Sequence, residues 1–133
     1  MKYCADTWFL FELKNKSKKA LELYKEILYG KGKLIIPSIC IFELIRLAIR
    51  SGITLSSIDS LINEMKVSQK IQVIVLDENI AKEAAKVSVT FGVPTVDSIV
   101  AATFKISGCD ILLSKDDDLS LLAKKKYLRI ENW

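Results

Sequence analysis

The sequence contains no histidine, and this absence excludes several kinds of enzyme. Without an imidazole there can be no Ser-His-Asp or Cys-His nucleophile, no paired-histidine ribonuclease mechanism and no HExxH zinc site. An enzyme with this composition must therefore work with carboxylates, hydroxyls, lysines or a metal ion.

Glycine, proline, cysteine and long apolar stretches are also scarce in the sequence. Five glycines and two prolines are too few for a loop-rich or all-β protein. The longest apolar stretches, such as residues 34–42, fall well short of the ~20 residues that span a bilayer, so we expect no membrane segment. No signal peptide is expected either, because Asp6 and Glu12 interrupt the apolar N-terminal stretch. Three cysteines, Cys4, Cys40 and Cys109, predict buried free thiols in a reducing, cytoplasmic setting.

The length of 133 residues fits a single domain, residues 1–133, and 50% hydrophobic residues indicate a well-filled core. Twenty basic residues against 16 acidic ones give a net charge of +4, and 17 of the basic residues are lysines. This balance suits either a solvated surface or attraction to a polyanion.

Short apolar runs alternate with amphipathic stretches along the chain. The expected helices lie near residues 7–15, 17–29, 38–51, 56–67, 77–91, 95–104 and 118–124, and the expected strands near residues 2–5, 34–36, 72–76, 111–113 and 127–130. Wholly apolar strands separated by helices are typical of a parallel sheet covered on both faces. The predicted fold class is therefore α/β with three layers.

Acidic residues recur where these strands end. Asp6 follows the first strand, Glu43 lies in the second turn of the helix after the second strand, and Asp97 lies near the start of its helix. Residues 116–118, all Asp, follow the strand at 111–113. Carboxyl ends of parallel strands meet at one edge, so all can reach one crevice. Asp77 also follows a strand, and spacing alone cannot exclude it.

Each acid also has a purely structural explanation. Asp6 and the 116–118 run can cap helices, Asp97 suits the first turn of a helix, and Glu43 can pair with Arg46. Together, however, four or five carboxylates in one crevice would repel one another unless a cation neutralised them. Oxygen ligands without histidine favour Mg²⁺ or Mn²⁺, which support hydrolytic phosphoryl chemistry.

The order of these motifs resembles the PIN domain family, and most of all the VapC-type toxins of toxin-antitoxin pairs. The resemblance covers the whole chain and is carried by Asp6-Thr7 and by the segments 37–44 (PSICIFEL), 94–102 (PTVDSIVAA) and 112–119 (LLSKDDDL). It implies a three-layer α/β/α sandwich with a five-stranded parallel sheet. A receiver-like domain fits less well, because it would need a pair of acids directly after the first strand.

The resemblance also implies roles for individual residues. Catalytic and metal-binding carboxylates correspond to Asp6, Glu43, Asp97 and Asp116, with Asp118 as a candidate fifth metal ligand and Ser114 as a supporting hydroxyl. The family's strand order would remove Asp77 from the site. Which of the three acids at 116–118 point inward stays open.

The activity implied is that of an Mg²⁺- or Mn²⁺-dependent endoribonuclease toxin. Hydrolysis by a metal-activated water would leave a 5′-phosphate and a 3′-hydroxyl. The implied partners are RNA, a small antitoxin protein and a second copy in a homodimer; the alternative is a non-catalytic PIN-like module that binds RNA or protein. Three arginines and no obvious aromatic stacking platform predict that RNA shape selects the target.

Overall fold

Five short strands form one parallel sheet, as the sequence predicts. The structure, a computed structural model, describes all 133 residues. The strand order is β3-β2-β1-β4-β5, and every neighbouring pair is parallel. The strands are β1 (Lys2–Ala5), β2 (Lys33–Pro37), β3 (Ile71–Ile74), β4 (Ile111–Leu113) and β5 (Ile130–Glu131).

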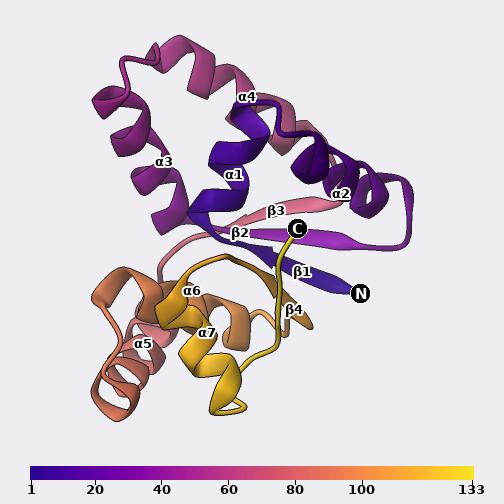
Figure 1. Ribbon diagram of the computed structural model, residues 1–133. Coiled ribbons are helices and arrows are strands. Elements are labelled where there is room, and N and C mark those ends of the chain that lie inside the picture. The colour runs from indigo at the N-terminus through magenta and orange to yellow at the C-terminus, as the bar shows by residue number, and fades with distance from the viewer.

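Helices cover both faces of the sheet, which confirms the three-layer α/β prediction. The helices are α1 (Thr7–Lys14), α2 (Lys18–Tyr29), α3 (Ser38–Arg50), α4 (Leu55–Val67), α5 (Glu78–Phe91), α6 (Thr95–Ile106) and α7 (Asp117–Lys124). Helices α1 to α4 lie on one face, and α5 to α7 lie on the other (Figure 1). The chain moves outward from β1 to β3 and then returns to β4, so right-handed crossovers place the two sets of helices on opposite faces.

The central strands are apolar because helices bury them from both sides. Cys4, Ala5, Leu34, Ile35 and Leu112 are almost fully buried in the main core. Burial on both faces removes the alternation of polar and apolar residues that marks a half-exposed strand. The edge strand β3 differs, because its Gln72 is exposed.

The chain leaves β1 and β4 toward opposite faces of the sheet, although these two strands are neighbours. No helix therefore closes the space beyond their carboxyl ends, and such a switch point is where open α/β sheets place their ligand sites. Asp77 follows β3, two strands away from β1, and caps α5 by accepting a 2.8 Å hydrogen bond from the Ile80 N–H. Strand order thus separates Asp77 from the crevice.

Two local expectations were wrong. The last strand begins at Ile130 and not near 127, because the Tyr127 N–H donates to the Leu122 carbonyl and still belongs to the end of α7. All three cysteines are free thiols, but Cys109 is only half-buried. No helix has the length and apolar character needed to cross a membrane.

Candidate metal centre

A cavity of about 420 Å³ lies beyond the carboxyl ends of β1 and β4. Four of the acids singled out from the sequence line it: Asp6 after β1, Glu43 on α3, Asp97 on α6 and Asp116 after β4. Residues up to 110 positions apart in the chain are therefore brought to one place by the parallel sheet. Asp77 does not line this cavity.

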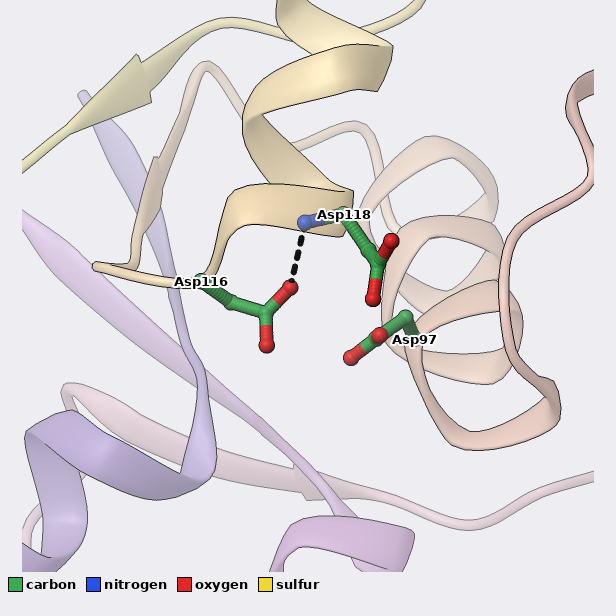
Figure 2. A group of neighbouring side chains, drawn as sticks. All are labelled: Asp97, Asp116 and Asp118. Carbon is green, nitrogen blue, oxygen red and sulfur yellow. Dashed lines mark hydrogen bonds between the residues drawn. The ribbon is translucent and has the colours of Figure 1, made fainter.

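Three of the carboxylates converge closely. Oxygen atoms of Asp97, Asp116 and Asp118 lie within 4.8 Å of one another (Figure 2). Opposite ligands of Mg²⁺ are about 4.2 Å apart, so small side-chain rotations suffice for these oxygens to share one ion. A set of carboxylate oxygens without nitrogen or sulfur suits Mg²⁺ or Mn²⁺, and the residues present thus fit the ion that the fold family implies.

The turn after β4 holds Asp116 in place. Its Oδ1 accepts hydrogen bonds from the N–H groups of Asp118 at 2.8 Å and Leu119 at 3.1 Å, so Asp116 caps α7. The Asp116 N–H in turn donates to Oγ of the buried Ser114 at 3.0 Å. Capping uses one carboxylate oxygen and leaves Oδ2 available to a ligand.

Asp6 is the most buried acid of the cavity, with 4% of its surface exposed. It caps α1, because its Oδ1 accepts a 3.0 Å hydrogen bond from the Phe9 N–H. Burial raises the pKa of Asp6 to about 6, although the Ser114 hydroxyl and the N–H groups at the start of α1 oppose the rise. The capping explanation is correct for Asp6, and the carboxylate still faces the cavity.

Glu43 is held by α1. Its Oε1 accepts a 2.9 Å hydrogen bond from the Thr7 hydroxyl, which joins the start of α1 to α3. The ion pair with Arg46, which was the alternative structural explanation of Glu43, does not form; the two ion pairs of the chain join Lys82 to Glu78 and Lys115 to Glu12. Arg46 is exposed and lines the cavity instead.

Asp97 experiences the strongest electrostatic conflict in the cavity. Burial raises its pKa to about 7, and the negative charges of Asp116, Asp118, Glu43 and Asp6 add to the rise. A perturbed carboxylate in a cleft is a common feature of functional sites. The cavity is therefore arranged to favour a bound cation or bound protons at neutral pH.

We expect the metal-free protein to lose stability as pH rises. Asp97 and Asp6 have pKa values of about 7 and 6 in the folded chain, above the ordinary value of 3.8. The folded state then binds more protons than the unfolded state between about pH 4 and 7, so the free energy of unfolding falls through that window. Thermal unfolding in chelator from pH 4.5 to 8 measures this. The Asp97→Asn variant should show a flatter profile; equal slopes for both proteins would contradict the assignment.

The geometry also separates the three consecutive acids. Asp118 joins the carboxylate cluster and Asp117 does not, although both are exposed and neither lines the cavity. We expect Asp118→Asn to weaken Mn²⁺ binding roughly tenfold, because an oxygen ligand is lost. Asp117→Asn removes the same charge one residue away and should leave binding within about twofold. Calorimetric titration with Mn²⁺ measures the affinity of both variants. Equal losses of Mn²⁺ affinity in Asp118→Asn and Asp117→Asn would contradict the assignment of Asp118 as a ligand.

Comparison with known proteins adds to this geometry. The family model of the PIN domain matches residues 3–125. The chain belongs to the PIN domain family. No curated protein matches this PIN domain.

Solved structures share its fold at low sequence identity. VapBC2 from Rickettsia felis, bound to a DNA fragment from its promoter, has a TM-score of 0.75 at 14% identity, with 100% of this chain and 99% of the other covered. VapBC-1 from nontypeable Haemophilus influenzae gives 0.73 at 20%, covering 100% and 98%. VapC20 from Mycobacterium tuberculosis, a sarcin-ricin loop cleaving toxin, gives 0.71 at 17%, covering 89% and 92%.

The sequence did not assign three further cavity residues, Trp8, Arg46 and Arg50. A signal for the arginines was present, because Arg46 and Arg50 follow Glu43 at helical spacing on an otherwise apolar helix. Trp8 stands two residues after Asp6, where nothing in the pattern distinguishes a cavity residue from a packed one.

Proposed function

We propose that this PIN domain is a metal-dependent endoribonuclease, the toxin of a VapBC-type toxin-antitoxin pair. The observation that supports it best is the convergence of four acids from four separate segments in one cavity at the switch point of the sheet. The likeness to the VapC fold supports the same conclusion.

Asp6, Glu43, Asp97, Asp116 and Asp118 would hold Mg²⁺ or Mn²⁺. A bound ion would supply positive charge to the phosphoryl group and lower the pKa of water. The chain's own contribution is to hold the ligands still. The helix-capping bonds fix Asp6 and Asp116, the Thr7 hydroxyl orients Glu43, and Ser114 fixes the turn that carries Asp116.

The charge outside the cavity favours a polyanionic substrate. With the four cavity acids set aside, 12 acids remain against 20 basic residues. Lysines that can guide phosphates toward the acids are Lys14, Lys16, Lys18, Lys19, Lys115 and Lys124 to Lys126. Lys115 is already engaged, because its ammonium pairs with Glu12 and lies over the Trp133 ring.

Analysis of product ends tests the type of reaction. Hydrolysis by water needs neither a histidine nor the 2′-hydroxyl, so we expect RNA fragments with a 5′-phosphate and a 3′-hydroxyl. Fragments ending in a 2′,3′-cyclic phosphate would instead indicate attack by the 2′-hydroxyl and would overturn this mechanism.

The rival function is a PIN-like module that binds RNA or protein without cutting. Loss of one acid would favour it, but all four acids line the cavity. We therefore favour the nuclease function over the binding module.

We also propose two protein partners. An antitoxin is favoured because the similar folds include those in VapBC complexes, and the product of a small reading frame directly upstream should copurify with the chain.

A homodimer is favoured by exposed apolar residues in one stripe of α3, where Phe42 and Ile49 are 57% and 60% exposed. Light scattering should give twice the monomer mass of 15.0 kDa. We place the protein in the cytoplasm, where its free thiols stay reduced.

A further inference from the structure

We propose that Trp8, Arg46 and Arg50 form a nucleotide-binding wall that seats an unpaired RNA strand beside the metal centre. This inference rests on the proposed nuclease function and names the part of the substrate that the cavity contacts. The three residues lie on α1 and α3 and line the same cavity as the four acids. We call them the α1–α3 wall.

Trp8 offers an aromatic surface at the cavity. It is 47% exposed, although its chain neighbours Phe9 and Leu10 are almost fully buried. A perpendicular contact with Phe11, with ring centroids 5.8 Å apart, restrains the indole. A restrained and exposed indole is a suitable platform for a nucleobase, and stacking of this kind accepts any base.

Arg46 and Arg50 supply charge on the same wall. Both are exposed, and neither takes part in the ion pairs of the chain. They follow Glu43 by three and seven residues, which places them about 4.5 and 10.5 Å farther along the axis of α3. The cavity thus carries acids at one end and uncompensated guanidinium groups along one wall.

This polarity fits a nucleic acid strand whose scissile phosphate lies at the metal centre. Flanking phosphates would then bind Arg46 and Arg50, since guanidinium groups pair well with phosphate oxygens. A neighbouring base would stack on Trp8. Bases within an A-form duplex are already stacked, so the wall accepts nucleotides that are unpaired at the cleavage site.

Binding measurements separate the two parts of the wall. The full-length Asp97→Asn protein, in Mg²⁺, is titrated with a fluorescent 12-nucleotide unpaired RNA and with the matching duplex. Trp8→Ala should weaken binding of the single strand about tenfold and leave the salt dependence unchanged. Arg46→Ala/Arg50→Ala should lower the slope of log K against log salt by about 1.4, the value for two lost phosphate contacts. Duplex binding should be weaker than single-strand binding and insensitive to Trp8→Ala.

Matched controls remove similar side chains elsewhere. Tyr29 is an exposed aromatic residue, and Arg129 is an exposed arginine, and neither lines the cavity. Tyr29→Ala and Arg129→Ala should bind RNA like the parent protein, and Trp8→Phe should recover part of the affinity. If Trp8→Ala binds RNA as tightly as Tyr29→Ala, the stacking role is overturned, even where the wild type cuts RNA. If the parent protein binds no RNA, and the wall variants differ from it only in failing to bind a protein partner, then the α1–α3 wall is a protein interface and the inference fails. Failure of the nuclease proposal is recognised separately, by wild-type protein that binds RNA through Trp8 and does not cut it.

Discussion

Replacing Asp97 by asparagine is expected to abolish RNA cleavage and to stabilise the metal-free protein. Asp97 lines the cavity and belongs to the cluster of three carboxylates whose oxygens lie within 4.8 Å of one another, so its replacement removes a candidate metal ligand. We expect kcat/KM to fall at least 1,000-fold, which corresponds to a loss of roughly 4 kcal/mol of transition-state stabilisation. The same carboxylate carries a pKa raised to about 7 by burial and by its acidic neighbours. A neutral amide relieves that conflict, and we expect a gain of roughly 1 kcal/mol after allowing for solvent screening.

Asp77→Asn is the matched control for this experiment. Asp77 also follows a strand and also caps a helix, but it lies two strands from β1 and outside the cavity. The control should retain full cleavage and gain no stability. Cleavage rates and thermal unfolding in chelator report both effects. If the Asp97→Asn protein were inactive only because it is unfolded, thermal unfolding would not show the expected gain in stability.

Mn²⁺ affinity is expected to fall about 100-fold between pH 7.5 and 5.5. In the metal-free protein the pKa values of Asp97 and Asp6 are about 7 and 6, so both carboxyls are mostly protonated at pH 5.5. Ion binding must displace these protons, and for the two values together the protonated fraction accounts for roughly two orders of magnitude in apparent affinity. The apparent Mn²⁺ affinity falls as pH falls, because protons then occupy the carboxylates that would bind the ion.

Calorimetry in buffers of different ionisation enthalpy measures both the affinity and the number of protons released. We expect roughly 1.4 protons released for each ion bound at pH 6 and roughly 0.6 at pH 7. Affinity independent of pH over this range, with no proton release, would show that these two carboxyls are not ligands. The Asp117→Asn variant should behave like the wild type in the same titration.

The fold was predictable where burial dominates the sequence pattern. β1, β2 and β4 are covered on both faces, and their apolar runs predicted a parallel sheet of three layers. β5 was misplaced because backbone bonds at the end of α7 occupy Tyr127, and such local closure leaves no trace in hydrophobicity. Lateral strand order, which removes Asp77 from the site, was accessible only through the resemblance to the PIN family.

The candidate site was predictable in composition but not in its contacts. Asp6, Glu43, Asp97 and Asp116 were nominated because strand ends meet at one edge, and the structure places all four at one cavity. The hydrogen bond between Glu43 and Thr7 was not predicted, because Thr7 comes from a different helix and no local spacing connects the two residues. Trp8 was missed for a similar reason: exposure at a cavity depends on how α1 and α3 lie together.

RNA cleavage in the presence of Mn²⁺ and of excess EDTA is the most direct test of a metal-dependent nuclease. Wild-type protein is incubated with total RNA under both conditions, beside the Asp97→Asn and Asp77→Asn variants. We expect discrete fragments with Mn²⁺ from the wild type and from Asp77→Asn, and none from Asp97→Asn or from any of the three proteins in EDTA. Cleavage that persists in EDTA, or that Asp97→Asn retains in full, would contradict the proposed metal-dependent nuclease function.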